Sequence, residues 1–271
     1  MRRGTARKYS SRKTYKIKKR KPIYRSKIFW VIFISATLVA GIVYLLIFSR
    51  YFWVSTVDVL GTQRINRASI VEEIERDIDN RLVFPSRSIF LFSTTEARNN
   101  LKKTHPAIEE VEITKKLPSL LAVTIRERSA IALWFSNQRF YQIDKYGIIF
   151  EEVAAGDRLI IRPKEDNVSV SIGGQVAKED MMRIIIQIDQ SMKQNSGLIV
   201  REAVIDNNEQ ITIITADGWS VFFGIKNDIN WQLEKLKAVL EKQIPVDGRK
   251  ELEYIDVRFG NLAPYRYRDK Q

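Results

Sequence analysis

One apolar stretch constrains this chain more than any other feature. Residues 28–48 carry no charge, and residues 1–27 before them hold thirteen Lys or Arg and no Asp or Glu. A helix needs about 20 apolar residues to cross the roughly 30 Å hydrocarbon core of a bilayer, and a basic flank stays on the cytoplasmic side. The sequence therefore predicts a single-pass type II membrane protein. Residues 1–27 are its cytoplasmic tail, residues 28–48 its transmembrane helix, and the rest is extracytoplasmic.

A cleaved signal peptide is the alternative for this segment. The apolar part of a signal peptide has about 7–15 residues and leads into small residues at the cleavage site. Here the run is longer, and mostly bulky residues follow it: Ser49, Arg50, Tyr51, Phe52 and Trp53. We therefore expect an uncleaved anchor, with Tyr51 and Trp53 in the far interface, where amphipathic rings collect.

The charge of the chain separates the tail from the remainder. The protein has 45 Lys+Arg and 32 Asp+Glu, and thirteen of the basic residues lie in the tail, so residues 28–271 carry 32 of each sign. The basic excess therefore does not predict a nucleic-acid-binding domain. Basic clusters beside a membrane helix attract anionic lipid head groups, which is the role we expect for the tail. A specific cytoplasmic partner is the alternative.

Residues that carry chemistry are scarce. The chain has no cysteine and one histidine, His105, which excludes disulfides and thiolate nucleophiles, and the usual His-based zinc sites need more than one His. We interpret His105-Pro106 as the end of a helix. The sequence contains no Walker or dinucleotide-binding glycine loop and no nucleophile elbow. We expect no enzymatic activity, no cofactor and no metal.

Carboxylates are the remaining candidates for acid chemistry. Adjacent pairs at residues 72–73, 109–110 and 151–152 are interpreted as solvated charges, because neighbouring side chains point in different directions. Asp256 lies between Ile255 and Val257 in an apparent strand. It is either an acid or metal ligand, or the partner of a nearby Arg at the top of the sheet.

Residues 54–127 follow the order strand, helix, helix, strand, strand. Asn66 is a good N-cap before a helix with a stripe of isoleucines, and Ser93 starts a capping box that opens the second helix. Period-two alternation around Val111 and Val123 predicts two strands with a turn at Pro118.

This order resembles the POTRA domain, and particular residues carry the resemblance. Val57-Asp58-Val59-Leu60-Gly61 is similar to its opening strand. The closing hairpin is matched by His105-Pro106, Ile108, Val111, Ile113, Leu117-Pro118, Val123, Ile125 and Glu127-Arg128. Its continuation into residues 130–134 resembles the FtsQ/DivIB cell-division proteins.

The second unit starts near Arg128. Residues 140–150 read as a hairpin in which Gly147 supplies a positive φ and Asp144 bonds its own backbone. Residues 159–170 are strand-like. Residues 181, 184, 185, 188 and 192 form a helical stripe, and strands are expected at 198–205, 210–215 and 219–223. A last helix begins after Asp228, and residues 253–259 form a closing strand.

Residues 140–150, 219–224, 235–236 and 254–259 resemble the C-terminal module of FtsQ. The resemblance covers residues 54 to about 267 and implies an α+β fold: one transmembrane helix, a βααββ POTRA domain, and a mixed or antiparallel β-sheet module with flanking helices. The expected divisions are the POTRA domain at 54–127, the FtsQ-type β domain at 128–260 and a C-terminal partner-binding edge at 261–271.

The resemblance implies a non-enzymatic scaffold of the bacterial divisome at the division septum. Its partners would be FtsB/DivIC-like and FtsL-like single-pass proteins, with septal wall-synthesis proteins possible through the POTRA domain. Two alternatives stay open. One is a membrane-anchored envelope enzyme acting on cell-wall polymer, and the other is a POTRA-type envelope assembly or secretion factor, although tandem repeats and a barrel are not visible.

Partner binding is expected at the C-terminal segment. In the FtsQ family the segment after the Asp-x-Arg strand receives the FtsB/DivIC partner, and a sheet edge can accept an added strand. Tyr and Arg are common interface anchors. Carried over position by position, the partner-binding residues are Phe259, Asn261, Ala263, Tyr265 and Tyr267. The alternative is a frayed terminus with aromatic residues that cover the sheet.

Overall fold

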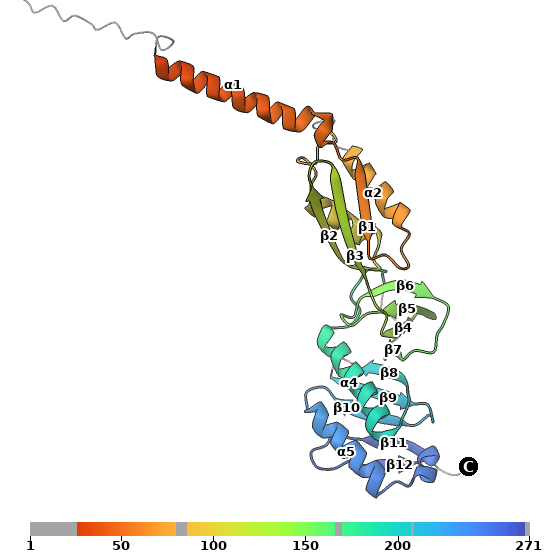
Figure 1. Ribbon diagram of the computed structural model, residues 1–271. Coiled ribbons are helices and arrows are strands. Elements are labelled where there is room, and N and C mark those ends of the chain that lie inside the picture. Colours follow the sequence, from red (N-terminus) through yellow and green to blue (C-terminus); the bar gives the residue numbers. More distant parts are fainter. Residues whose placement is uncertain (1–25, 80–85, 166–169, 207–208, 269–271) are drawn as a thin grey trace, which may run out of the picture.

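The computed structural model describes residues 26–79, 86–165, 170–206 and 209–268, and its parts follow one another from α1 to the C-terminus (Figure 1). Helix α1 spans Lys27–Phe48, and none of its residues is buried against the rest of the protein. It is long and apolar enough to cross a membrane. A helix therefore forms where the transmembrane segment is expected, and most of the expected basic tail, residues 1–27, lies outside the described residues. A short 3-10 helix, η2 (Arg50–Phe52), follows.

The βααββ unit forms in the expected order. Its sheet has the order β1-β3-β2, with β1 parallel to β3 and β2 antiparallel to β3. Two helices pack against it and enclose a separate core. The elements are β1 (Thr56–Leu60), α2 (Arg67–Asp79), α3 (Thr94–Thr104), β2 (Ile108–Lys116) and β3 (Leu120–Glu127).

The expected caps and stripes account for both helices of this unit. Asn66 Oδ1 accepts a hydrogen bond from Ala68 N at 2.9 Å, and Ser93 Oγ accepts one from Glu96 N at 3.3 Å. Both bonds satisfy N–H groups that a helix start leaves unpaired. The isoleucine stripe of α2 is buried, as expected. The expected loop at residues 80–88 is described only from Ser86 onward.

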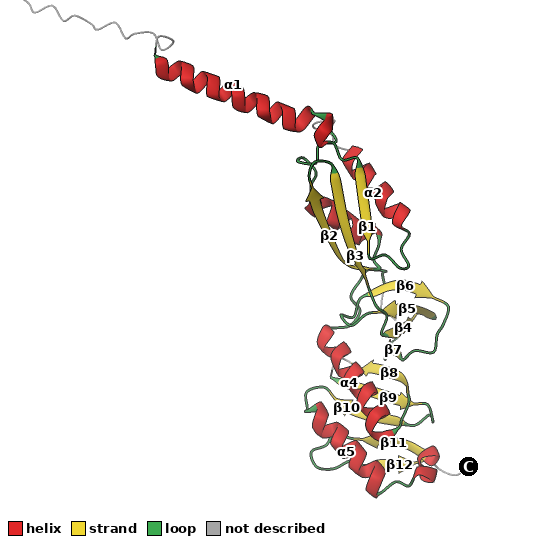
Figure 2. Ribbon diagram, in the orientation of Figure 1, coloured by secondary structure: helices red, strands yellow, loops and turns green. Residues whose placement is uncertain are grey.

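A nine-stranded mixed sheet forms the second unit, in the order β12-β11-β10-β9-β8-β7-β4-β5-β6. Helices α4 and α5 lie side by side over its strands (Figure 2), and one core joins them to the sheet. The helices are α4 (Glu179–Ser196), α5 (Ile229–Lys242) and the 3-10 helix η3 (Val246–Glu251). The strands are β4 (Ala132–Ser136), β5 (Arg139–Ile143), β6 (Ile149–Val153), β7 (Ile160–Pro163), β8 (Val200–Asp206), β9 (Gln210–Thr215), β10 (Ser220–Gly224), β11 (Leu252–Asp256) and β12 (Tyr265–Tyr267).

Three details of the second unit differ from expectation. Strand β7 ends at Pro163, because proline cannot donate to a ladder and favours strand ends. The closing strand stops at Asp256, where the chain bends away before it returns as β12. On α4 the buried set includes Met182, while Ile184 is only half-buried.

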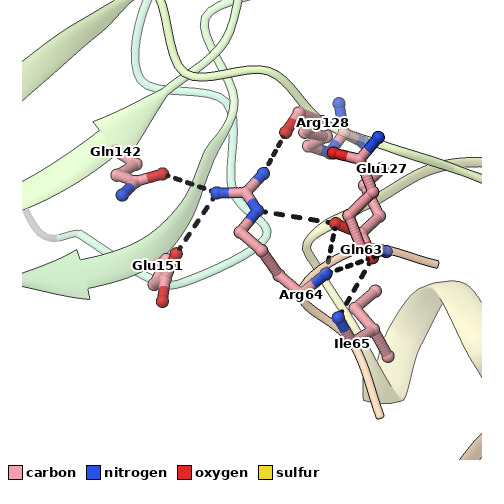
Figure 3. Close-up of polar contacts among 7 residues, drawn as sticks. All are labelled: Gln63, Arg64, Ile65, Glu127, Arg128, Gln142 and Glu151. Carbon is pink, nitrogen blue, oxygen red and sulfur yellow. Dashed lines mark hydrogen bonds and ion pairs between the residues drawn. The ribbon is translucent and has the colours of Figure 1, made fainter. Parts of the chain in front are cut away.

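The two units meet at a polar junction (Figure 3). The carboxylate of Glu127, at the end of β3, accepts hydrogen bonds from Gln63 N, Arg64 N and Ile65 N at 2.8, 3.0 and 3.0 Å. The Arg64 guanidinium then reaches the second unit, where Nη1 donates to Gln142 Oε1 at 3.1 Å. Burial alone would raise the pKa of Glu127, but the three backbone donors outweigh it and lower that pKa.

Arg128 adds a second link at this junction. Its Nε donates to Pro106 O at 3.0 Å, and its Nη1 pairs with Asp144. Asp144 Oδ1 also accepts hydrogen bonds from Tyr146 N and Ile148 N, both at 2.9 Å. The expected turn of the β5–β6 hairpin is therefore present, and its carboxylate also binds the arginine that follows the βααββ unit.

Candidate functional site

Strand β12 is the edge of the nine-stranded sheet and pairs antiparallel with β11. Pro264 O accepts a hydrogen bond from Asp256 N, and Arg268 N donates one to Glu251 O, both at 2.8 Å. Backbone polar groups of successive strand residues point to opposite sides in the plane of the sheet. The backbone polar groups of residues 264, 266 and 268 therefore face β11. The N–H and C=O groups of residues 265 and 267 face outward.

The side chains of β12 form two distinct faces. The rings of Tyr265 and Tyr267 lie 5.8 Å apart at 89°, and each residue is 37% exposed. On the other face, Arg266 Nε lies 3.0 Å from Glu253 Oε2 on β11. An outward backbone edge beside a partly exposed aromatic pair is what strand addition requires: hydrogen bonds for affinity and pockets for specificity.

A buried lysine holds the chain between β11 and β12. Lys235, on α5, donates through Nζ to three carbonyls: Val257 O at 2.5 Å, Phe259 O at 3.1 Å and Gly260 O at 2.8 Å. Burial lowers the pKa of Lys235, and the charge of Asp256 partly offsets this effect. The ammonium thus fixes the bend from which β12 returns to the sheet.

An open groove of about 620 Å³ lies between α5 and the C-terminal segment. Trp231, which is 52% exposed, donates from Nε1 to Gly260 O at 3.3 Å and links the helix to that segment. Both apolar and polar residues line the groove. The lining residues are Lys235, Ala238, Val239, Lys242 and Gln243 of α5, with Phe259, Asn261, Leu262, Ala263, Pro264 and Tyr265.

Asp256 forms a pair with Arg258. Arg258 Nε donates to Oδ1 at 2.8 Å, and its Nη2 donates to Oδ2 at 2.5 Å. The same guanidinium donates to Gln210 Oε1 at 2.7 Å and lies over the rings of Phe222 and Phe259. Of the two interpretations of Asp256, the structure therefore supports the arginine pair.

The structure brings most of the expected partner-binding residues together. Four of them, Phe259, Asn261, Ala263 and Tyr265, line the groove, and Tyr267 lies on β12. Ala263 is half-buried and packs against the core, whereas Phe259 is 54% exposed. Their role in binding a partner stays a prediction.

Sequence reasoning missed the contribution of α5 to this site. Trp231, Lys235, Ala238 and Lys242 are spaced by four, three and four residues, which places them on one helix face. A lysine within an apolar face, with a tryptophan one turn before it, is the signal that could have found them.

Two acidic residues are less solvated than expected. Glu73 Oε2 lies 3.0 Å from His105 Nε2, and the Glu73 side chain is 13% exposed. The Glu109 side chain is 15% exposed and lies beside Arg126 and Lys145. The expectation of fully solvated pairs is wrong for these two, because neighbouring elements bring partners that adjacency in sequence does not reveal. Within the described ranges, no group of three His, Cys, Asp or Glu could hold a metal ion.

Family models match both units. The model described as "POTRA domain, FtsQ-type" matches residues 52–128, and "Cell division protein FtsQ/DivIB, C-terminal" matches residues 132–258. A solved structure of the major extracytoplasmic domain of the cell-division protein DivIB from Geobacillus stearothermophilus is 15% identical. The alignment covers 44% of this chain and 98% of the DivIB chain, with a TM-score of 0.28.

Curated relatives carry the same names. "Cell division protein DivIB" of Clostridium tetani is 25% identical over 243 residues, which is 83% of each chain. DivIB of Clostridium botulinum strain Loch Maree is 25% identical over 92% of this chain and 94% of its own. "Cell division protein FtsQ" of Chloroflexus aurantiacus is 26% identical over 86% of this chain and 84% of its own. With both family models matched in sequence order, the chain belongs to the FtsQ/DivIB family of cell division proteins.

Proposed function

We propose that this protein is a non-enzymatic, membrane-anchored scaffold of the division machinery at the septum. It recruits an FtsB/DivIC-like single-pass protein, together with an FtsL-like protein, through the C-terminal edge. The supporting observation is the geometry of β12: outward backbone groups at residues 265 and 267, a partly exposed tyrosine pair, and the groove beside it. An added strand would extend the sheet while its side chains enter the groove.

Partner recruitment tests this function. The full chain and the FtsB/DivIC-like protein of the same organism are expressed together in membranes and co-purified. Tyr265→Ala with Tyr267→Ala should abolish co-purification and septal recruitment of the partner, because truncating an anchoring aromatic typically costs about 2 kcal/mol, or roughly 30-fold in affinity. Partner binding at wild-type strength would contradict the proposal.

A matched control comes from the same sheet. Phe135 and Phe140 form a half-buried aromatic pair with rings 4.8 Å apart, on β4 and β5, away from the β12 edge. The double variant Phe135→Ala with Phe140→Ala should keep partner binding. If both double variants lose the partner equally, aromatic packing in the sheet would explain the loss, and the β12 edge would not.

The proposal also fixes topology. The basic tail lies in the cytoplasm, where it contacts anionic lipid head groups. Both folded units are extracytoplasmic. The POTRA unit is therefore free to meet septal wall-synthesis proteins. A reporter that is active only outside the cytoplasm should work when fused after Gln271. Activity of a cytoplasm-only reporter at that position would overturn this topology.

A further inference from the structure

The end of α1 is hydrogen-bonded to the βααββ unit. Ser86 Oγ donates to Ile47 O at 2.5 Å, and Ser88 Oγ donates to Leu46 O at 2.9 Å. A helix leaves its last carbonyls without partners of its own, and these serines satisfy two of those carbonyls. Backbone bonds from Val54 N to Arg87 O at 2.9 Å and from Ile89 N to Phe52 O at 2.8 Å continue the contact. Residues 86–90 are thus held at the level where the helix leaves the bilayer.

The β2–β3 turn lies at the same end of the unit. Ser55, just before β1, donates through N to Ser119 O at 3.0 Å, and the two hydroxyls lie 3.1 Å apart. Lys115 Nζ, near the end of β2, donates to Phe90 O at 3.3 Å and joins that strand end to the 86–90 segment. Figure 1 shows this connection at the end of the three-stranded sheet nearest α1.

This end carries apolar side chains that the protein leaves uncovered. Leu117 is 62% exposed, Tyr51 67% and Phe90 42%. The exposed basic residues Arg50 and Lys116 accompany them. In the described part of the chain, neither basic residue has an acidic partner. We call these five residues, Arg50, Tyr51, Phe90, Lys116 and Leu117, the membrane-proximal rim.

We propose that the membrane-proximal rim is a lipid-binding surface. It rests in the head-group interface of the membrane face from which α1 emerges. Leu117, Phe90 and Tyr51 enter the boundary between head groups and acyl chains, about 5–10 Å deep for apolar faces of this kind. Arg50 and Lys116 contact anionic phosphates, as basic residues beside a membrane do. Such contacts hold the βααββ unit in one orientation on the membrane, in addition to its tether through α1.

Two observations favour lipid over a protein as the occupant. Ser86 and Ser88 bind the segment that carries Phe90 to the last turn of the apolar helix, so this end of the βααββ unit cannot move away from that turn without breaking those bonds. The rim also combines apolar and aromatic groups with positive charge, which matches an anionic bilayer interface.

Depth-dependent quenching tests the proposal on the full chain. The protein contains no cysteine, so Leu117→Cys introduces a unique site for an environment-sensitive fluorophore. Leu262→Cys is the matched control, since Leu262 is a 72% exposed leucine in the C-terminal segment. Each labelled protein is reconstituted in nanodiscs that contain phosphatidylglycerol and lipids bearing a quencher near the head group. The label at 117 should lose most of its fluorescence, and the label at 262 should keep it. Equal quenching at both positions, or none at 117, would overturn the proposal.

Lipid composition supplies a second readout. Nanodiscs of phosphatidylcholine alone should quench the label at 117 less than anionic nanodiscs do. Combining Arg50→Gln and Lys116→Gln with Leu117→Cys should remove that difference. If the lipid-borne quencher leaves the label at 117 unaffected while addition of the FtsB/DivIC-like protein shifts the emission of that label, the rim is a protein-binding surface and lipid binding is refuted. Because the β12 variants leave the rim intact, failure of partner recruitment and failure of lipid contact are distinguishable.

Discussion

Charged residues that bond to backbone groups position two segments of this protein. Lys235 satisfies three carbonyls between β11 and β12, and Glu127 satisfies three N–H groups before α2. In both cases a buried charge compensates its loss of hydration through several hydrogen bonds. The shape of the candidate site and the junction between the units therefore depend on single side chains.

Replacing Lys235 should disturb the C-terminal edge. Lys235→Met keeps the aliphatic stem but leaves three carbonyls without their donor, and an unsatisfied buried polar group costs about 1–3 kcal/mol. We expect a lower free energy of unfolding in urea and weaker partner binding. Lys242→Met, on the same helix but exposed, is the control and should change stability by less than about 0.5 kcal/mol. Wild-type stability of Lys235→Met would show that the lysine does not hold this segment.

Glu127 should make the junction sensitive to acid. The pKa of Glu127 in the folded protein lies below the ordinary value for Glu. Its contribution to the free energy of unfolding is therefore complete above the unfolded pKa of about 4.3, and it is lost as the pH falls through the lower folded pKa. Amide exchange at residues 63–65 should therefore accelerate in acid beyond its intrinsic pH dependence. Glu127→Gln should exchange faster already at neutral pH, with no further acid component. An identical pH profile in the variant and the wild type would contradict this role.

At the scale of elements, local signals predicted most helices and hairpins. The isoleucine stripe of α2, the Ser93 cap of α3 and the turn at Gly147 all appear as expected. The alternation of Tyr265, Arg266 and Tyr267 indicates two faces, but the path of the last segment was not predictable, because three residues are too few to fix where a strand pairs. Its place depends on Lys235 and on pairing with β11, and both are contacts between segments distant in sequence. The order of the nine strands depends on such contacts as well.

The backbone of β12 should contribute to partner binding independently of its side chains. Tyr267→Ala removes the ring, whereas Tyr267→Pro removes the ring and also the outward N–H. Edge strands tolerate proline, so both variants should fold. One lost hydrogen bond is worth about 1 kcal/mol, so the proline variant should bind the partner roughly 5-fold more weakly than the alanine variant. Equal affinities, measured by titration with the partner, would argue against strand addition at this residue.

On the scale of the whole molecule, the membrane helix and the candidate site lie at opposite ends. In Figure 1 the βααββ unit follows α1, and the nine-stranded sheet leads on to β12 and the C-terminus. Arg64, which is held by Glu127, contacts Gln142 of the second unit, and Arg128 pairs with Asp144 of that unit. The β12 edge therefore lies at the far end of the molecule from α1, and under the proposed function the extracytoplasmic part of a single-pass partner reaches it there.

The central claim is that β12 accepts a strand from the partner. Amide hydrogen exchange of the full chain in nanodiscs, with and without the FtsB/DivIC-like protein, measures this most directly. Strand β6 is the internal control, because it is the other edge of the same sheet. Partner binding should slow exchange at Tyr265 and Tyr267 and leave β6 unchanged. Slowed exchange at β6 or in the βααββ unit, with β12 unaffected, would contradict the claim and move the interface there.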